Sequence, residues 1–445
     1  MTSLTKHDEL LVFVKYFTGR GVVPIEPLET PIKEAPAVHK KCPLRTAEEA
    51  FLVNNMFASF LSSGKPGYVI AVSGGFVANG RYRVVGAGNT GKKGVRRPSD
   101  ELCAKLAQAC TEFISGNTMP RNPNDMSAIL VASLNICHAE VAHRLITIHE
   151  GSKLITPTMS STGIPNKRGL KQLYSNLCSA VAPLKDDLKR WGTLGSQDKS
   201  EVATRYAKLL KVASKLWDAT KDLGSIQSKP QMQHLYTLNA IAKGLQLLCG
   251  FPHGTRVDFN WPQGPINGDA FTYQPANAKT ALLQTMTGDL IDKSAIRDHK
   301  LRKKMRTKRK KAAILQTEYQ FHCEIYLALH ILFSESAVQF HSFRVEEGKR
   351  VFTIGCSKAS CVGCWDILLG LARQDSSNHP IYVCRTRHSH GKCYATWGLT
   401  PRVKFLPSSL RQEVTGLKKT QMLNSLNQAI KYCHHEFKQR IESSM

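Results

Sequence analysis

Apolar residues recur at three- and four-residue spacing through most of residues 100–249, in stretches such as ELCAKLAQACTEFI and SEVATRYAKLLKVASKLWDATKDL. This spacing is typical of helices that bury one face, and it predicts a mostly helical section. Residues 250–275 break the pattern with Gly, Pro and Asn, which predicts an irregular connector.

A β-hairpin is predicted ahead of this section, over residues 67–91. Short β-branched runs at 68–72 and 82–85 lie on either side of an Asn-Gly dipeptide, which favours a two-residue hairpin turn. The glycines around Asn89 indicate backbone that must approach another group closely.

The C-terminal half alternates between helical and strand patterns. Helices are predicted at 319–332 and 361–372, strands at 350–354 and 381–384, and an amphipathic helix at 421–441. Because helices and strands alternate, the two strands could lie parallel in one sheet. The predicted fold class is therefore α/β.

Length and cysteine usage narrow the class of protein. The chain has 445 residues, which suits two or three domains or one domain with a large insertion. No apolar run reaches the roughly 18–20 residues of a membrane span, and the first residues lack a secretory signal pattern, so we expect no membrane partner. Thirteen cysteines, an odd number spread widely, favour a reduced intracellular protein of the nucleus or cytoplasm.

The net charge of +27 indicates a polyanionic partner, most often nucleic acid. The expected partner is DNA, single- or double-stranded, or RNA, although a generally solvated basic surface would give the same charge. The densest basic run, 297–311, could be a nuclear import signal, a helix that binds the phosphate backbone or a disordered arm. Its candidate backbone contacts are Arg302, Lys303, Lys304, Arg306, Lys308, Arg309, Lys310 and Lys311.

A candidate metal site combines two motifs. Cys361 and Cys364 form a C-x-x-C, and His322 and Glu324 lie upstream in QFHCEIYLALHI. His-x-Glu followed by C-x-x-C is the signature of zinc-dependent base deaminases. One imidazole and two thiolates can bind zinc and leave its fourth position to water. Zn²⁺ is thus the expected cofactor, held by His322, Cys361 and Cys364.

The residue types explain the expected chemistry. Zinc lowers the pKa of its bound water toward neutrality, so that hydroxide forms at physiological pH. This zinc hydroxide would attack the amino-bearing carbon of a base. Glu324 would take the proton of the water and return it to the ring nitrogen and the leaving amine.

Two alternatives remain open on the residues alone. The first is that His138 is the metal ligand, because His138 and Glu140 also form an H-x-E. No C-x-x-C follows this second motif until Cys361, however. The metal could instead be structural, in a non-catalytic nucleic-acid-binding protein. A structural site, however, has no use for the carboxylate of Glu324.

Three stretches resemble the Orientia-type deaminases, a family expanded in fungi: HCEIYLALHI, IGCSKASCVGCW and RHSHGKCYATW. The resemblance covers residues 319–400. This family belongs to the superfamily of the AID/APOBEC enzymes and the tRNA adenosine deaminases. The general motif of that superfamily has Pro before the first cysteine, where this chain has Ser360.

The resemblance implies a cytidine-deaminase-like sheet of about five strands, flanked by helices and opened by a β-hairpin. The hairpin at 67–91 is the candidate for that opening, so a large helical insertion would interrupt the deaminase fold. The corresponding division of the chain is an N-terminal helical segment (1–60), the hairpin (61–99), the helical insertion with its connector (100–300), the zinc core (301–400) and a C-terminal helical segment (401–445).

The resemblance also implies substrate contacts. Asn89 would contact the target nucleotide, because GAGN is similar to the end of the second strand in tRNA-type deaminases. His388, His390 and Lys392 would lie near the mouth of the pocket, where contact with phosphate or base and structural hydrogen bonding are both open. Trp365 would form core or pocket wall.

The function expected from these observations is hydrolytic deamination of a base in nucleic acid, with cytosine to uracil in DNA preferred. Deamination of adenine in RNA or DNA is the alternative, because both bases present an amine beside a ring nitrogen.

Overall fold

The computed structural model describes residues 43–64, 68–77, 80–91, 94–95, 97–116, 126–150, 167–220, 230–261, 271–273, 317–319, 322–333, 343–344, 350–358, 360–361, 364–365, 367–368, 382–386 and 424. The basic run at 297–311 lies outside these residues, as do His388, His390 and Lys392. Nearly all of the predicted helix at 421–441 also lies outside them.

The predicted hairpin forms strands β1 (Ile70–Val77) and β2 (Arg81–Gly88), which pair antiparallel along their whole length. Gly80 lies in the turn with φ of 67°, in the left-handed region that glycine adopts without a steric penalty. The Asn-Gly signal in the sequence therefore located this turn correctly.

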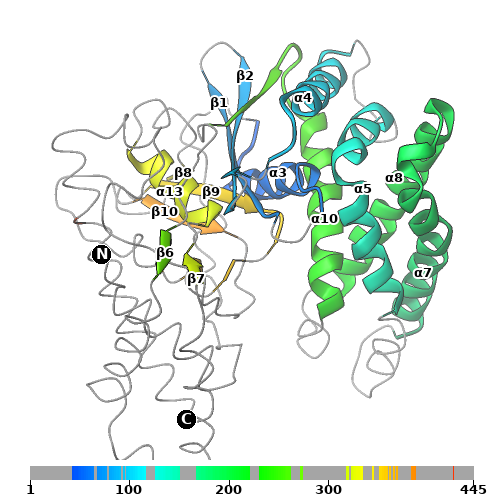
Figure 1. Ribbon diagram of the computed structural model, residues 1–445. Coiled ribbons are helices and arrows are strands. Elements are labelled where there is room, and N and C mark those ends of the chain that lie inside the picture. The colour runs from blue at the N-terminus through cyan, green and yellow to red at the C-terminus, as the bar shows by residue number, and fades with distance from the viewer. Residues whose placement is uncertain are drawn as a thin grey trace, which may run out of the picture.

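Residues far away in the sequence join the hairpin in one sheet. Strand β9 (Arg350–Cys356) pairs antiparallel with β1, where Ala71 lies opposite Cys356. Strand β10 (Tyr382–Thr386) pairs parallel with β9, as predicted from the alternation of helices and strands. The hairpin and the C-terminal strands thus share one sheet (Figure 1).

Two further strands complete this mixed sheet within the described residues. Strand β5 (Arg256–Asn260) pairs parallel with β2, and the short β8 (Phe343–Arg344) pairs antiparallel with β9. The strand order is β10-β9-β1-β2-β5, with β8 attached to β9. The described residues also include two small ladders, β3 (Thr90–Gly91) with β4 (Gly94–Val95) and β6 (Phe271–Tyr273) with β7 (Thr317–Tyr319).

The prediction of an irregular connector at 250–275 is wrong for β5 and β6. In β5 the side chain of Val257 is buried and Phe259 packs against the core. The Val257 amide donates a hydrogen bond to Thr111 Oγ1 at 3.0 Å. The Gly, Pro and Asn residues on both sides concealed a five-residue strand that depends on the free edge of β2.

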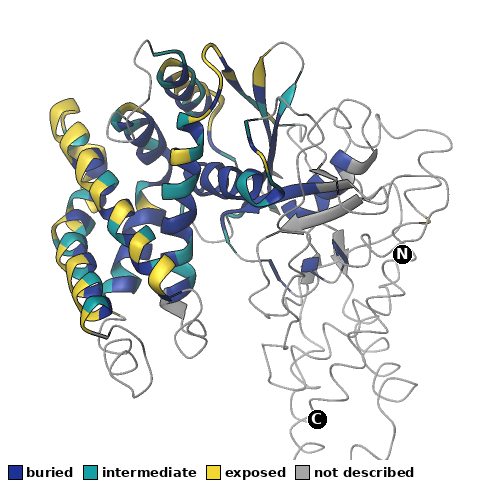
Figure 2. Ribbon diagram, turned by 180° about the vertical axis from the view of Figure 1, so that it is seen from behind, coloured by how far each residue is buried: buried dark blue, intermediate teal, exposed yellow. Residues whose placement is uncertain are grey.

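Helix α3 (Ala47–Phe60) is buried along almost its whole length and packs on β1 and β9 (Figure 2). Its approach to β9 is close, because a Cβ at Gly355 would collide with the Asn54 backbone. The Asn54 side-chain amide donates to the carbonyl oxygen of Thr353 at 3.0 Å and to its hydroxyl at 2.8 Å. Buried polar groups therefore align this helix on the sheet.

The predicted helical section forms five long helices in the part of 100–249 that the structure describes. They lie beside the sheet in Figure 1, and α10 packs against both α3 and α8. Their buried residues form one continuous hydrophobic core with α3 and the hairpin. These helices are α4 (Asp100–Ser115), α5 (Ser127–Glu150), α7 (Lys167–Lys189), α8 (Ser196–Thr220) and α10 (Pro230–Cys249). The single turn η3 (Trp191–Thr193) connects α7 to α8.

By length and composition alone, α5 is the one described helix that could cross a membrane. Its apolar window is 67% buried inside the molecule. Burial of this kind is common to core helices of a bundle, which pass the same test of length and hydropathy.

Helix α13 (Cys323–Phe333) covers the sheet next to the hairpin, in contact with β1, β2 and β9. The sequence predicted this helix from residue 319, but Tyr319 lies in β7 and the helix begins at Cys323. Propensity alone locates helix ends poorly. The N-terminal start of α13 is fixed by the capping contact from Asn89, which is described below.

Candidate metal centre

His322 is held at the N-terminal end of α13. Its carbonyl oxygen accepts a hydrogen bond from the Tyr326 amide at 3.1 Å, so His322 is the residue that precedes the first turn. The next amide, of Cys323, donates to Asn89 Oδ1 at 3.0 Å. Amides in the first turn of a helix have no acceptor within the helix. Asn89, the residue that follows β2, supplies an acceptor for the Cys323 amide and so fixes the start of α13.

Cys361 and Cys364 lie in the segment that follows β9. Ser357, the first residue after that strand, is bound to β1 twice: its amide donates to the Ile70 carbonyl at 2.9 Å, and its hydroxyl accepts from the Ile70 amide at 3.0 Å. Further on, the Cys364 amide donates to Cys361 Sγ at 3.4 Å. A helical turn begins here, with Trp365 N donating to Cys361 O at 3.0 Å. The spacing of three therefore brings both thiols to one side.

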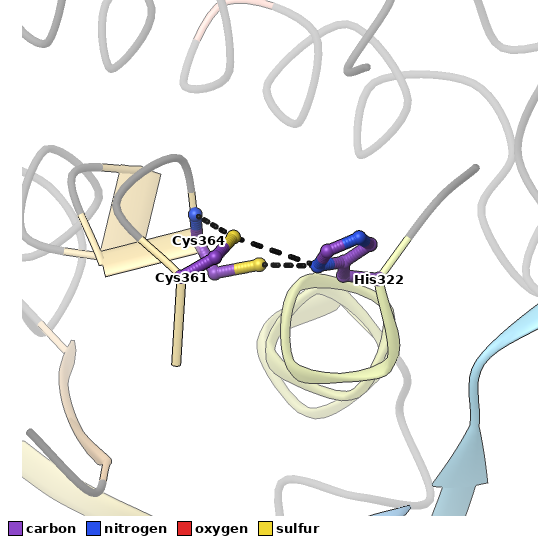
Figure 3. A group of neighbouring side chains, drawn as sticks. All are labelled: His322, Cys361 and Cys364. Carbon is purple, nitrogen blue, oxygen red and sulfur yellow. Dashed lines mark hydrogen bonds between the residues drawn. The ribbon is translucent and has the colours of Figure 1, made fainter. Parts of the chain in front are cut away.

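The two thiols and the imidazole converge, as Figure 3 shows. His322 Nδ1 lies 3.5 Å from Cys361 Sγ and 3.3 Å from Cys364 Sγ. The three ligand atoms lie within 4.8 Å of one another, and both cysteines are buried. In a tetrahedral zinc site, with bonds of about 2.0 Å to nitrogen and 2.3 Å to sulfur, neighbouring ligand atoms are separated by roughly 3.5 Å. The arrangement therefore fits a zinc ion with one position left for a further ligand.

The charges at this cluster also suit a metal. Burial raises the pKa of Cys361, but hydrogen bonds from Cys364 and the neighbouring His322 outweigh it and lower that pKa well below its usual value. For His322 the signs are reversed. Burial lowers the pKa of the imidazole, but the neighbouring Cys361 thiolate outweighs burial and raises this pKa overall. Without a metal the pair thus favours thiolate and imidazolium. A zinc ion would replace the imidazolium proton as the partner of the thiolate.

Glu324 lies beside the cluster in the first turn of α13. Its side chain is buried, and its Oε2 atom accepts a hydrogen bond from Cys323 Sγ at 3.3 Å and from Cys364 Sγ at 3.9 Å. Burial raises the pKa of Glu324 above its ordinary value. A carboxylate with a raised pKa is a stronger proton acceptor than an ordinary glutamate. The sequence motifs gave no signal for the contact between Cys323 and this carboxylate.

Two other predicted site residues lie near the cluster. Trp365 is buried, and its Nε1 atom has no hydrogen-bond partner among the described residues. Asn89 lies at the edge of the site, but its side-chain oxygen is engaged by the Cys323 amide. The predicted nucleotide contact of Asn89 therefore remains a prediction, with the capping bond as an observed role.

The second H-x-E has a different environment. His138 lies in α5 and its Nδ1 is 3.0 Å from the carbonyl oxygen of Leu134. Glu140 forms a buried ion pair with Arg144. Within the described residues, neither belongs to a group that could hold a metal, whereas His322, Cys361 and Cys364 do.

Comparison with known families adds to this geometry. Residues 321–402 match the deaminase family model described as OTT_1508_deam. This deaminase segment contains all three candidate ligands and Glu324, and it covers nearly the same residues as the resemblance noted in the sequence. No curated protein and no solved structure matches the chain.

Proposed function

We propose that the protein is a zinc-dependent deaminase that converts cytosine to uracil in DNA. The observation that carries the proposal is a buried carboxyl group, Glu324, next to a His-Cys-Cys cluster inside the deaminase segment. A structural zinc site is usually closed by four protein ligands and needs no carboxyl group beside them, whereas this cluster offers three ligands. The carboxyl group beside them favours an enzyme.

The sheet supports a cytidine-deaminase-like core. It contains an antiparallel hairpin, β1 and β2, followed in space by the parallel pair β9 and β10, with α13 packed on the hairpin and β9. On this proposal the core is discontinuous in sequence. The helices of residues 100–249 would then be an insertion between its second strand and the helix that carries His322.

The chemistry assigns a role to each residue. His322, Cys361 and Cys364 would hold the zinc ion, which supplies an activated water for attack on the amino-bearing ring carbon. Glu324 takes a proton from that water and delivers protons to the ring nitrogen and the departing amine. Cys323, whose pKa burial raises well above its usual value, stays protonated and donates its S–H to Glu324.

The choice of substrate rests on charge. The net charge of +27 favours a polyanion over a free base or nucleoside. Single-stranded DNA requires no extrusion of the base, which costs a few kcal/mol in a duplex, and is therefore the substrate proposed first.

The test is to incubate the purified protein with single-stranded DNA, duplex DNA and RNA of one mixed sequence and to sequence the products. We expect C-to-U conversion in single-stranded DNA, abolished in the Cys361→Ser variant. Conversion of adenine to hypoxanthine would reassign the base, and conversion confined to RNA would reassign the nucleic acid. No conversion of any substrate would favour a structural metal in a nucleic-acid-binding protein.

A further inference from the structure

Helix α5 carries a buried ion pair that faces the deaminase segment. Arg144 Nη2 lies 3.0 Å from Glu140 Oε1, and the two side chains are only 2% and 5% exposed. The packing around them is tight: a Cβ at Gly64, which has φ of 74°, would lie 2.6 Å from the Glu140 amide nitrogen. The turn after α3 therefore holds this part of α5 at a fixed position.

The same guanidinium reaches the segment that leads to the metal cysteines. Arg144 Nη2 donates to the carbonyl oxygen of Ser357 at 3.0 Å. Ser357 is already bound to β1 through its amide and hydroxyl, so the arginine fixes its remaining backbone group. The next residue, Lys358, lies near enough to Glu140 to act with Arg144 in lowering the pKa of that carboxyl against the effect of burial.

Stability alone does not account for such a pair. Removing two charges from water costs several kcal/mol for each ion, and well-packed apolar residues at the same positions are often as stable or more stable. What an apolar pair could not provide is a hydrogen bond to the carbonyl group of Ser357. The pair therefore supplies a contact that apolar residues of equal stability would lack.

We propose that Arg144, oriented by Glu140, is a positioning residue for the metal site. It fixes the carbonyl group of Ser357 and thereby the path of the chain from β9 to Cys361 and Cys364. The helical section would then contribute to zinc binding without supplying a ligand. This inference rests on the proposed zinc site, but its test reads the metal directly and does not require the substrate to be known.

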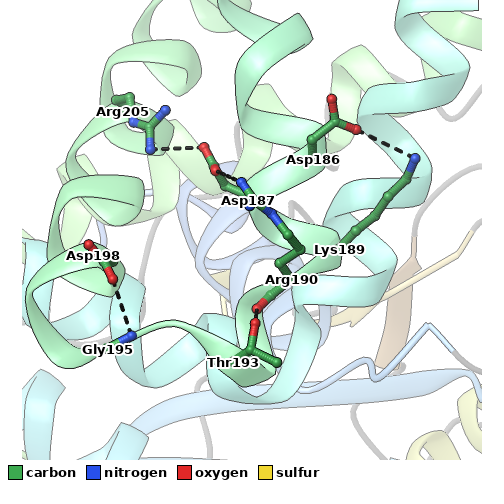
Figure 4. Close-up of polar contacts among 8 residues, drawn as sticks. All are labelled: Asp186, Asp187, Lys189, Arg190, Thr193, Gly195, Asp198 and Arg205. Atoms are coloured by element: carbon green, nitrogen blue, oxygen red, sulfur yellow. Dashed lines mark hydrogen bonds and ion pairs between the residues drawn. The ribbon is translucent and has the colours of Figure 1, made fainter.

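The experiment compares four variants with the wild-type protein. Arg144→Met breaks the pair, and Glu140→Met/Arg144→Met replaces it by apolar side chains. Glu140→Gln/Arg144→Gln gives a neutral polar pair that is too short to reach Ser357. The control is Arg205→Met, which removes a more exposed arginine of α8. Its Nη2 atom lies 2.9 Å from Oδ2 of Asp187 in α7 (Figure 4).

Three quantities are measured for each protein: the melting temperature, zinc affinity by competition with a chromophoric chelator, and the absorption spectrum after Co²⁺ replaces zinc. Metal affinity falls about 10- to 100-fold when groups that orient ligands are lost. We expect roughly tenfold weaker zinc binding and a shifted cobalt spectrum in all three variants of the pair. Any of these variants that keeps the wild-type melting temperature should show the same loss, because the effect is on the position of the ligands. Arg205→Met should change neither.

The proposal is overturned if either double variant, once folded, binds zinc with wild-type affinity and gives the wild-type cobalt spectrum. The pair would then act on stability alone. Because these readouts do not involve deamination, they hold even if the protein proves to have no deaminase activity. A wild-type protein that binds no zinc would instead refute the site on which the inference rests.

Discussion

Cys361 receives hydrogen bonds from its neighbours before any metal arrives. The Cys364 amide donates to its sulfur at 3.4 Å, and the His322 imidazole lies 3.5 Å away. These contacts lower the pKa of the Cys361 thiol and so favour the thiolate, which is the form that binds zinc. At the scale of single residues, a backbone amide and a side chain together stabilise the charged form of a candidate metal ligand.

The first prediction follows from that chemistry. Cys361→Ser removes the thiolate, and a serine hydroxyl does not ionise near neutral pH. We expect zinc content to fall from about one ion per chain to near zero, measured by plasma mass spectrometry of the purified protein. His138→Ala, which changes the other H-x-E, should keep its zinc. Full zinc in the Cys361→Ser protein would rule out this cysteine as a ligand.

The sequence could predict these residues because the motif is local. Two cysteines three positions apart and a histidine two positions from a glutamate are visible without a structure. Arg144 gave no such signal, because its partner Ser357 lies 213 positions away. Glu140 and Arg144 are only four positions apart, a spacing that allows an ion pair on any helix. The H-x-E spacing offered His138 as an alternative metal ligand, whereas the burial of the Glu140–Arg144 pair depends on how α5 packs.

At the scale of elements, the start of α13 depends on the end of β2. Asn89 Oδ1 accepts from the Cys323 amide, which gives the helix a cap from another element. Loss of a capping side chain costs about 1 kcal/mol. The hairpin thus positions His322 and Glu324 even though neither residue is part of it.

The second prediction separates capping by Asn89 from contact with a nucleotide. Asn89→Ala should lower the free energy of unfolding by about 1 kcal/mol, measured by chemical denaturation, whereas Asn89→Asp keeps an oxygen for the cap and should lose little. If Asn89 also contacts the base, both variants should bind single-stranded DNA more weakly. An Asn89→Ala protein with wild-type stability would contradict the capping role.

A third prediction concerns pH and the α5 ion pair. The pKa of Glu140 is lowered in the folded protein, because Arg144 and Lys358 outweigh its burial. A carboxyl with a lowered folded pKa contributes stability above its unfolded pKa, and this contribution is lost as the pH falls through the folded pKa.

Glu140→Gln should therefore destabilise the protein by about 3 kcal/mol at neutral pH, measured by denaturant unfolding. The difference from wild type should shrink below about pH 4, the ordinary range of a glutamate. A difference that stays constant from neutral to acid pH would mean that the charge of Glu140 does not stabilise the fold.

Patterns also show why some elements could be predicted and others could not. The hairpin and β9 were found because their residues are strand formers with a clear turn or boundary. Strand β5 was missed because its five residues lie between Gly- and Pro-rich stretches, and it forms only where β2 offers an edge. Its structure is a property of the sheet more than of its own sequence.

At the scale of the whole molecule, the sheet joins parts of the chain that the sequence keeps far apart. Ala71 and Cys356 lie opposite each other in β1 and β9, and the five long helices described between residues 100 and 249 lie between them in the chain. The described helical section carries exposed basic side chains, but some of them are matched by acids, such as Arg190 and Arg205 by Asp187 (Figure 4). Along the sequence, Lys and Arg are densest in the run at 297–311.

The fourth prediction tests whether that run binds nucleic acid. Replacing its eight basic residues from Arg302 to Lys311 by neutral residues should weaken DNA binding and flatten the dependence of affinity on salt. The reason is that each phosphate contact contributes roughly 0.7–0.9 to the logarithmic slope through counterion release. Titrations at several salt concentrations measure the slope. An unchanged slope would place the binding surface elsewhere.

The central claim is that Glu324 transfers protons beside a zinc ion held by His322, Cys361 and Cys364. Its most direct test measures zinc content and deamination together for the wild-type and Glu324→Gln proteins, on whichever oligonucleotide the wild type converts. Glutamine keeps the size and hydrogen-bonding shape but cannot accept the proton. We predict unchanged zinc and DNA binding with deamination slower by about 10²- to 10⁴-fold. A Glu324→Gln protein that deaminates at nearly the wild-type rate would contradict the account.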